Sequence, residues 1–343
     1  MKELVGKKVF IVEPLDGINT QFDLYRQSGC ELAVGPYVSE KDKGYSKEAL
    51  IKIGNEYDAV IGMSREKFTR DIIMNSNRVK MIAKTGIGMD HIDIDAATEK
   101  GILITNTPSQ NDMDVAEFAV GLILSLMKGF FRNDAYLRTM HWRDVTTLGK
   151  ELYHHRVGLV GFGNIGRHVA KRLSGWECEI IAYDPYISQE KADSFGLNVR
   201  MVDWETLFKT SDAISMHLPL TKETRNCVGK REFEMMKKDA IFVNTSRGPI
   251  VDLEALSWAL HSGEIGAAGI DTHAKEPIGP DYPLLDLHDN VILTSHLGGW
   301  AQGGLTRMTE IAARNTIESL CGKLPKYTCN PQVESFWRKR FGI

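Results

Sequence analysis

Three side chains with complementary chemistry follow three apolar runs of the sequence. Arg247 comes after AIFVN, Glu276 after GAAGI and a short loop, and His296 after VILT. A guanidinium can hold a carboxylate by two hydrogen bonds and polarise a neighbouring carbonyl oxygen. An imidazole can exchange a proton with that oxygen, and a carboxylate on its far ring nitrogen favours the protonated form. Together the three residue types suit proton transfer on a small acid that carries a carbonyl or hydroxyl group.

A glycine pattern earlier in the chain can bind the phosphates of a dinucleotide. The stretch RVGLVGFGNIGRHVA (156–170) places Gly161, Gly163 and Gly166 in the order G-x-G-x-x-G, between an apolar run and an amphipathic segment. There the first glycine permits a tight turn, the second lets the backbone approach a pyrophosphate, and the third allows close packing of helix on strand. The sequence therefore predicts a dinucleotide-binding turn. The alternative is an ordinary strand-helix turn that happens to be rich in glycine.

Asp184, which ends the next apolar run, indicates whether the dinucleotide is NAD or NADP. Asp184 closes EIIAYD, about 20 residues beyond the glycine pattern, which is the spacing of a ribose-binding acid. A carboxylate at this place accepts hydrogen bonds from a ribose 2′-hydroxyl and repels a 2′-phosphate. We therefore predict NAD rather than NADP as the cofactor.

Each residue of the first set also has a structural interpretation when it is taken alone. A strand-end arginine often forms an ion pair, a glutamate before proline is usually a solvated loop residue, and a histidine beside glycines is often structural. The catalytic interpretation is favoured because Arg247, Glu276 and His296, with Asp271, all follow expected strands after a dinucleotide-binding turn. Ligands of open α/β sheets bind outside the carboxyl ends of the strands, where these residues are expected to meet.

The elements that position these residues are apolar runs separated by amphipathic segments along the whole chain. Continuous apolar runs of this length predict parallel strands that helices cover on both faces. One intervening segment, 251–263, has an acidic first turn and a glycine stop, which are typical of a helix. The expected strands lie at 8–13, 58–62, 80–86, 101–106, 156–163, 179–184, 213–217, 240–244 and 290–295.

Two α/β domains are predicted from the length of 343 residues and from one long helical region. That region is expected to run from Asn111 to Met140, after four strands, and a helix at 306–320 is expected to return the chain to the first domain. We therefore place one domain at residues 1–108, completed by 299–343, and the other at 109–298, with a cleft between them.

The composition is that of a soluble globular protein, with 43% hydrophobic and 25% charged residues. A formal net charge of -3 offers no basic field, so neither nucleic acid nor an anionic membrane is expected as a partner. The longest apolar run, 118–127, is too short to span a bilayer and is expected to be buried, at a subunit interface or in the core. Five scattered cysteines and an N-terminus without a signal-like apolar segment favour a cytoplasmic location. We predict no metal site.

The sequence resembles the D-isomer-specific 2-hydroxyacid dehydrogenase family over nearly its whole length. The motifs that carry the resemblance are KTGIGMDHID (84–93), ITNTPSQNDMDVAEF (104–118), VGLVGFGNIGRHVA (157–170), HLPLT (217–221), NTSRGPIVD (244–252), GIDTHAKEP (269–277) and SHLGG (295–299). The resemblance implies a Rossmann-type NAD-binding domain beside a flavodoxin-like substrate domain, both doubly wound around parallel sheets. It also implies a homodimer built around the long helix, and the NAD-dependent interconversion of a D-2-hydroxy acid and a 2-keto acid.

Position by position, the resemblance implies roles for side chains of these motifs. Arg247, Glu276 and His296 match the family's substrate-binding and catalytic arginine, glutamate and histidine. Asp271 matches the acid that contacts the nicotinamide carboxamide, and Asp184 matches the acid that binds the adenosine ribose.

Backbone groups complete the implied site. Ile87 and Gly88 match positions whose N–H groups hold the substrate carboxylate, and the exposed amides of a glycine-rich loop suit an anion. Asn164 and Ile165 are expected near the pyrophosphate.

Departures from the family's pattern leave the substrate open. Relatives that act on phosphoglycerate usually place an arginine early in the loop after the third strand, where this chain has Met63, with Arg65 two residues later. Arg65 is interpreted either as a ligand of a phosphate or second carboxylate, or as a solvated loop residue. Asp114 stands where the family often has a small residue, and the sequence does not name its partner.

A second class of function shares these motifs. The C-terminal binding proteins resemble the same family, bind NAD(H) as transcriptional corepressors and keep the arginine, glutamate and histidine set. The site residues therefore leave this alternative open, and a turnover assay beside a peptide pull-down distinguishes the two classes.

Overall fold

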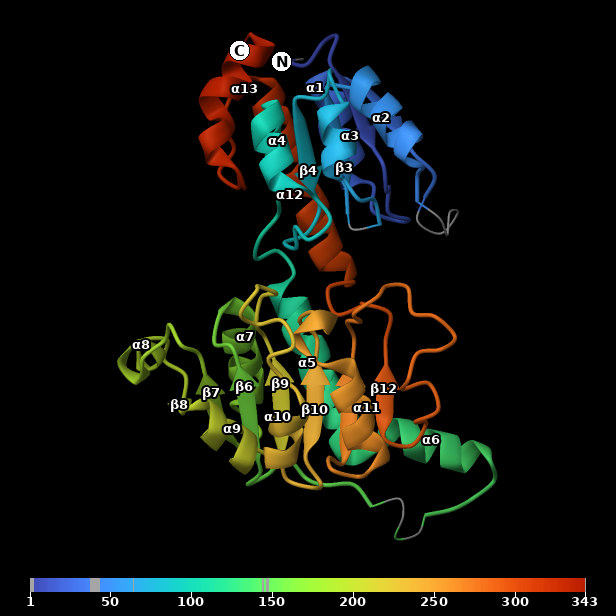
Figure 1. Cartoon of the computed structure of the whole chain (residues 1–343), viewed down its shortest axis with the longest axis vertical. Helices are drawn as coiled ribbons and strands as arrows, with labels where there is room; N and C mark the ends of the chain where they lie inside the picture. The colour runs from blue at the N-terminus through green and yellow to red at the C-terminus, as the bar shows by residue number, and fades with distance from the viewer. Residues whose placement is uncertain (1–2, 38–43, 64, 144, 146–147, 343) are drawn as a thin grey trace. The chain divides into compact units, whose positions relative to one another are not determined.

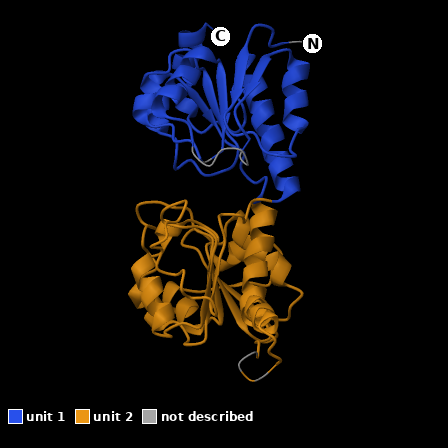
Figure 2. Ribbon diagram, turned by 90° about the vertical axis from the view of Figure 1, so that its right-hand side faces the viewer, with its two compact units in different colours: residues 1–111, 301–343 blue, residues 112–300 orange. Residues whose placement is uncertain are grey.

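The computed structural model describes residues 3–37, 44–63, 65–143, 145 and 148–342 of the chain. The chain forms two compact units, Met1–Asn111 with Ala301–Ile343 and Asp112–Trp300, which we call unit 1 and unit 2 (Figure 2). Each unit is built around one parallel sheet with helices on its faces (Figure 1). The predicted fold class, two parallel-sheet α/β domains, is thereby confirmed.

Unit 1 contains a five-stranded parallel sheet in the order β2-β1-β3-β4-β5. This is the order of flavodoxin-like sheets, in which the direction of growth reverses between β1 and β3. The central strands β3 and β4 are buried throughout, as their continuous apolar runs predict. The strands are β1 Lys8–Ile11, β2 Glu31–Val34, β3 Ala59–Gly62, β4 Met81–Lys84 and β5 Leu103–Thr105.

Helices cover both faces of this sheet because alternate strand residues point to opposite sides. Val9 and Ile61 pack in one cluster with side chains of α1, α12 and α13. Phe10, Val60 and Ile82 pack in another with side chains of α2, α3 and α4. The helices are α1 Thr20–Ser28, α2 Lys47–Glu56, α3 Arg70–Met74, α4 Ile94–Lys100, α12 Gln302–Leu320 and α13 Glu334–Phe341, with a 3-10 turn, η4, at Pro331–Val333.

Unit 2 contains a seven-stranded parallel sheet in the order β12-β11-β10-β9-β6-β7-β8. The chain first builds outward from β6 to β8 and then crosses back to β9, so the order reverses between β6 and β9. This is the doubly wound Rossmann arrangement with one added strand. The strands are β6 Arg156–Val160, β7 Glu179–Tyr183, β8 Arg200–Met201, β9 Ala213–Met216, β10 Ile241–Asn244, β11 Ala267–Ile270 and β12 Val291–Leu293.

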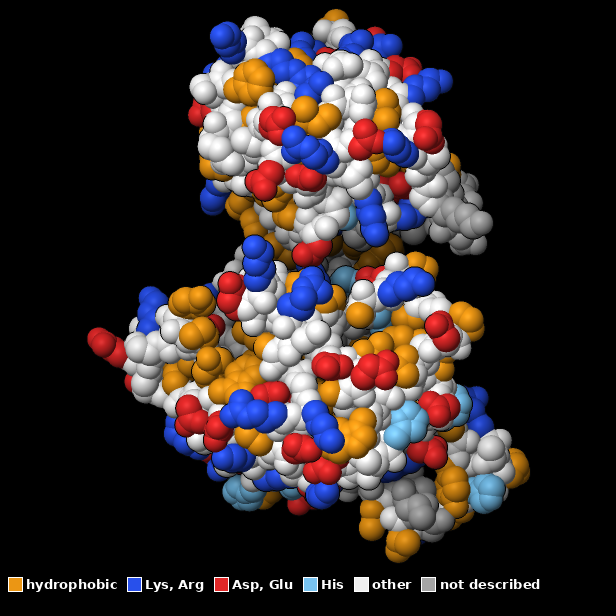
Figure 3. All heavy atoms as spheres, viewed as in Figure 1, with side chains coloured by type: hydrophobic (Ala, Val, Ile, Leu, Met, Phe, Trp, Pro, Cys, Tyr) orange, Lys and Arg blue, Asp and Glu red, His pale blue; other side chains and the backbone are white. Residues whose placement is uncertain are grey.

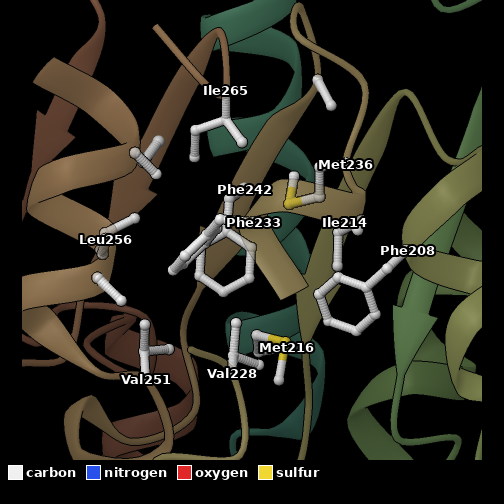
Figure 4. Close-up of a cluster of buried hydrophobic side chains, with 14 of the residues drawn as sticks. Phe208, Ile214, Met216, Val228, Phe233, Met236, Phe242, Val251, Leu256 and Ile265 are labelled. Atoms are coloured by element: carbon white, nitrogen blue, oxygen red, sulfur yellow. The ribbon is translucent and has the colours of Figure 1, made fainter. Parts of the chain in front are cut away.

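Two apolar clusters hold the helices of unit 2 on its sheet. In the first, Phe242 of β10 lies beside Phe233 of α10 and Leu256 of α11 (Figure 4). The second joins α5 and α7 to the other face, around Leu159 of β6 and Ala182 of β7. The helices are α5 Asp112–Lys128, α6 Phe130–Arg138, α7 Asn164–Leu173, α8 Gln189–Asp193, α9 Trp204–Thr210, α10 Lys230–Met235 and α11 Leu253–His261, with a 3-10 turn, η3, at Gly248–Ile250.

The expected helical region from Asn111 to Met140 is two helices. Gly129 separates α5 from α6 because its backbone adopts a left-handed conformation, with φ 63°, which a continuous helix cannot contain. Five strands rather than four precede α5, since β2 was missed by the sequence pattern. Among the described residues, no helix combines the length and apolar character needed to cross a membrane.

Candidate active site

The predicted glycine turn joins β6 to α7 in unit 2, and each of its three glycines is required or useful for a different structural reason. Gly161 has φ 97°, and a Cβ there would lie 2.7 Å from the carbonyl oxygen of His217. A Cβ on Gly166 would lie 2.3 Å from the carbonyl oxygen of Gly161, so this glycine lets α7 pack on the turn. Gly163 faces open space, with no atom within 4 Å of a Cβ. The open backbone beside the N-terminus of a ten-residue helix fits a pyrophosphate.

Asp184 holds this turn from the end of β7. Its Oδ2 accepts a hydrogen bond from the N–H of Phe162 at 2.9 Å, and its Oδ1 accepts one from the N–H of Tyr186 at 2.9 Å. The side chain is half-buried, so its oxygens can still accept bonds from ribose hydroxyls. A surface hollow adjoins it, lined by Tyr183, Ile187, Gln189, Met201 and Val202, among others. A partly apolar hollow beside a carboxylate fits the adenosine half of NAD.

Asn164 and Ile165 open α7, directly after the glycine turn. The Asn164 side chain accepts a hydrogen bond from Arg167, and Ile165 packs against the apolar cluster of α5 and α7. Both backbone N–H groups belong to the first turn of the helix, whose N–H groups lack helical partners. They lie where the sequence places them, at the anion-attracting end of α7.

His296 and Glu276 form a hydrogen-bonded pair at the carboxyl edge of the sheet. Nδ1 of His296 lies 2.9 Å from Oε2 of Glu276, and Oε1 of Glu276 accepts a bond from the N–H of His273 at 2.8 Å. Burial raises the pKa of Glu276, but these two hydrogen bonds and the histidine charges outweigh it and hold the pKa below 4.5. The carboxylate therefore stays ionised at neutral pH and fixes Nδ1 of the imidazole as a donor. Nε2 is left at the other edge of the ring for proton exchange.

The backbone of His296 is held in an unusual conformation. Its φ is 59°, in the left-handed region that a side chain other than glycine rarely adopts. Its N–H donates to the carbonyl oxygen of Asp271 at 2.8 Å. The carboxylate of Asp271 accepts the N–H groups of Leu297 at 2.8 Å and Gly298 at 2.9 Å, and the hydroxyl of Thr294 at 2.6 Å. These four hydrogen bonds offset the strain and orient the imidazole.

Asp271 thus holds the loop that carries His296, residues 294–298, by direct hydrogen bonds. The residue is 1% exposed, and a Cβ on Gly298 would lie 3.0 Å from its Oδ2, a tight contact that glycine avoids. The sequence motif pointed to a contact with the nicotinamide carboxamide, and that contact stays a prediction. Its hydrogen bonds to residues 294–298 are a role that the motif did not reveal.

Arg247 follows β10, the strand between β9 and β11. It is half-buried, and its Nη1 donates to the carbonyl oxygen of Ser246 at 2.7 Å. The next residue, Gly248, lies against the backbone of His273, where a Cβ would approach within 2.0 Å. The arginine turn is thereby packed on the loop that carries Glu276. Because β10, β11 and β12 are parallel neighbours, Arg247, Glu276 and His296 all lie at one sheet edge.

His273 is a site residue that sequence reasoning missed. Its ring contacts the Tyr282 hydroxyl at 3.0 Å and the carbonyl oxygen of Thr294 at 2.8 Å, and its N–H binds Glu276. Burial raises the pKa of Tyr282 to about 12, so that phenol remains a neutral partner. His273 ties the glutamate loop to the histidine loop. Its only signal in the sequence is its place inside DTHAKEP.

His217 follows β9 at the reversal point of the sheet, beside the glycine turn. Its N–H donates to the carbonyl oxygen of Val160 at 2.7 Å. Among the described residues, no hydrogen-bond partner reaches its buried Nε2. Burial lowers the pKa of His217 to about 3, so the imidazole is neutral.

The predicted carboxylate-binding turn lies in unit 1, directly after β4. Gly86 has φ 122°, and its N–H donates to the Thr107 hydroxyl at 2.8 Å. The Asn106 side chain donates to the carbonyl oxygen of Ile87 at 3.1 Å. Ile87 is exposed and Gly88 is half-buried. Binding of an anion by their backbone N–H groups stays a prediction.

Asp114 lies in the first turn of α5 with Asp112. A carboxylate is stabilised there by the positive end of the helix dipole, which supplies a physical reason for an acid at this position.

Comparisons with known proteins identify the family of this chain. Residues 120–298 match the family model of the D-isomer specific 2-hydroxyacid dehydrogenase NAD binding domain. The chain is 41% identical over 293 residues to a hydroxypyruvate reductase of Thermotoga maritima, covering 85% of this chain and 91% of that protein. It is 36% identical over 328 residues to a D-3-phosphoglycerate dehydrogenase of Archaeoglobus fulgidus, covering 95% of this chain and 60% of that protein.

Solved structures show the same fold. A Thermus thermophilus protein superposes with a TM-score of 0.85 at 30% identity, over 94% of this chain and 99% of that one. The D-lactate dehydrogenase with NAD+ from Lactobacillus jensenii gives a TM-score of 0.76 at 28% identity, again over 94% and 99%.

The chain belongs to the D-isomer specific 2-hydroxyacid dehydrogenase family. Its unit 2 contains the family's NAD binding domain, which confirms NAD as the predicted cofactor. The chain spans about 60% of the Archaeoglobus phosphoglycerate dehydrogenase and 54% of the one from Methanocaldococcus jannaschii.

Proposed function

We propose that this protein is an NAD-dependent oxidoreductase that interconverts a D-2-hydroxy acid and a 2-keto acid. The observation that carries the proposal is the pair of His296 and Glu276, joined at 2.9 Å at the sheet edge of an NAD binding domain. Bound NAD supplies the hydride acceptor or donor. The residues of the chain then have to move one proton and hold one carboxylate.

In the proposed reduction, Nε2 of His296 donates a proton to the keto oxygen, and Glu276 stabilises the positive imidazolium that gives it up. In the reverse direction the neutral imidazole takes the hydroxyl proton. Arg247 polarises the oxygen and holds the carboxylate through its planar fork. In unit 1, the N–H groups of Ile87 and Gly88 bind the carboxylate. Asp271 and Asp184 act at the nicotinamide carboxamide and the adenosine ribose.

Relatives support the reaction class. The relatives that the chain covers over most of their length include glyoxylate reductases of Thermofilum pendens and Thermococcus litoralis, at 37% and 36% identity, and the Thermotoga hydroxypyruvate reductase. The test is NADH oxidation by the purified protein with glyoxylate, hydroxypyruvate, pyruvate, branched keto acids and phosphohydroxypyruvate. Turnover of at least one is expected. Tight NADH binding without any turnover would contradict the proposal and favour a corepressor-like binding protein.

A homodimer in the cytoplasm is part of the proposal. Apolar side chains of α6 and of the segment after it are more than half exposed: Phe130, Leu137, Met140, Trp142 and Leu148. The space-filling view shows hydrophobic side chains at the surface around α6 (Figure 3). Such exposure favours a second copy of the chain as its cover. Sedimentation at micromolar concentration should give twice the chain mass, and a monomer would contradict the proposed dimer.

The proposed cytoplasmic location is supported by the cysteines. All five are free thiols, which suits a reducing compartment.

A further inference from the structure

A buried group of charged side chains lies at the reversal point of the unit 1 sheet. The strand order reverses between β1 and β3, and ligands of such sheets bind outside the carboxyl ends at that point. Glu13 follows β1, Arg65 and Glu66 follow β3, and Lys84 ends β4. The turn at residues 86–88, proposed to hold the carboxylate, begins two residues after β4. A substrate held by that turn would place its side chain near this edge of unit 1.

Arg65 is committed to two carboxylates of this group. Its Nε donates to Oε1 of Glu66 at 3.0 Å and lies 3.5 Å from Oε1 of Glu13. Its Nη2 donates to the carbonyl oxygen of Val12 at 3.4 Å. The Arg65 side chain is 17% exposed, and those of Glu13 and Glu66 are 4% and 3% exposed. The positive charge of the guanidinium is thus neutralised inside unit 1.

The two acids are fixed in turn by backbone groups. Glu13 accepts the N–H groups of Met63 and of Arg65, the latter at 3.0 Å. Burial raises the pKa of Glu13, and these N–H groups and the charges of Arg65 and Lys84 oppose that rise. Both oxygens of Glu66 accept the N–H of Tyr45, at 3.1 and 2.9 Å. Neither acid can swing away from the arginine without losing buried hydrogen bonds.

Lys84 adds no surplus of positive charge at this edge. It is 5% exposed, and its Nζ donates to the carbonyl oxygen of Thr85 at 2.9 Å. Among the described residues of this group, the two carboxylates of Glu13 and Glu66 balance the two cations of Arg65 and Lys84. A phosphate dianion entering here would meet two carboxylates without a compensating excess of cations.

Met63 stands where relatives that act on phosphoglycerate usually have an arginine, and its surroundings are apolar. Met63 packs against Leu15, Ile18, Leu305 and Met308, all within unit 1. A methionine in an apolar cluster offers no donor to a phosphate.

We infer that the substrate is unphosphorylated, as glyoxylate and hydroxypyruvate are, and that Glu13 and Glu66 exclude a phosphorylated substrate by neutralising Arg65. The inference rests on the proposed function and names the substrate class of that same site. A hydroxyl group is compatible with this edge because it can donate a hydrogen bond to a carboxylate, whereas a phosphate dianion cannot.

The experiment compares kcat/KM for hydroxypyruvate and phosphohydroxypyruvate with NADH. The wild-type protein should favour hydroxypyruvate by about 10-fold or more. Glu66→Gln keeps an acceptor for the N–H of Tyr45 but removes one negative charge, so it should raise the relative use of phosphohydroxypyruvate about 10-fold. Adding Arg65→Met to that variant should reverse the gain. Glu99→Gln, which removes the partner of the exposed Arg70 in the same unit, is the matched control and should change neither value.

The outcomes separate this inference from the proposed function. A wild-type preference for phosphohydroxypyruvate overturns the inference and leaves the proposed reaction standing. An unchanged substrate ratio in Glu66→Gln, with wild-type melting behaviour, overturns the role of the acid. If the whole keto-acid panel gives no turnover while NADH binds, the proposed function itself fails. The wild-type ratio requires no variant, so misfolding of a variant leaves the test intact.

Discussion

Replacing Glu276 with glutamine tests the proposed acid–base pair most sharply. The carboxylate accepts two N–H groups, one from Nδ1 of His296 at 2.9 Å and one from the backbone of His273 at 2.8 Å. Glutamine has one acceptor oxygen and an amide group that only donates. One of the two N–H donors must therefore lose its partner, and the positive charge that His296 carries during turnover loses its counter-charge.

The magnitude follows from these two losses. A hydrogen bond to a charged group contributes about 1.5–3 kcal/mol. The pair is partly exposed, with side-chain exposures of 43% for His296 and 38% for Glu276, so solvent screening favours the lower end. A loss of about 1.5–2 kcal/mol in the transition state lowers the rate about 10- to 30-fold.

The assay is steady-state NADH oxidation with the best keto acid, beside NADH binding by fluorescence. kcat/KM should fall by the stated factor while NADH affinity stays within about twofold, because Glu276 contacts neither the glycine turn nor Asp184. Glu264→Gln, at a surface pair with Lys238 in the same unit, is the control and should remain unchanged. A Glu276→Gln protein that turns over at the wild-type rate would refute the pairing argument.

Four further substitutions test other parts of the account. Arg247→Lys should lower kcat/KM about 100-fold, because a point charge cannot reproduce the planar fork; steady-state kinetics with unchanged values would show the arginine to be structural. Asp184→Ser should reduce the preference for NADH over NADPH at least about 10-fold, measured as a ratio of Kd values, and an unchanged ratio would contradict its ribose role. Gly298→Ala should lower kcat and the melting temperature, because the new Cβ would lie 3.0 Å from Oδ2 of Asp271. Gly175 faces open space, so Gly175→Ala is the control and should change neither value; equal effects of the two substitutions would contradict the packing argument. The folded-state pKa of His217 is lowered from 6.5 to about 3, so the unfolded chain takes up a proton first and stability falls as pH drops below 6.5. His217→Gln should therefore lose less unfolding free energy between pH 7 and pH 4.5 in urea titrations, and a loss equal to wild type would contradict the buried neutral imidazole.

The sequence predicted an element best where the residues of that element alone show a recognisable pattern. Buried strands such as β3, β4 and β10 are continuous apolar runs, so each can be recognised without its neighbours. Strand β2 was missed because it is an edge strand whose four residues are exposed or only partly buried, beginning with the exposed Glu31. Strand β8 has two residues, too few for any pattern. The expected helix from Asn111 to Met140 was drawn through Gly129, and only the left-handed backbone of that glycine shows that α5 ends there.

In the candidate site, too, local features were predictable from the sequence and long-range contacts were not. The glycine turn and the residues after β10, β11 and β12 were predictable because motif and strand end coincide. Long-range partners were not, since nothing in the sequence links Arg65 to Glu13, which lies 52 positions away. Nor could the pattern show that the carboxylate of Asp271 would accept N–H groups from the histidine loop. Such contacts depend on the register of neighbouring strands, which the motifs do not specify.

The central claim is that His296 exchanges the proton with the substrate oxygen. The most direct measurement is NADH oxidation by His296→Asn beside wild type, with the best keto acid and with NADH binding measured in parallel. The account predicts that kcat falls by roughly 10²–10⁴ while NADH binding is kept, as expected for the loss of a general acid and base. A variant with a wild-type rate would contradict the account.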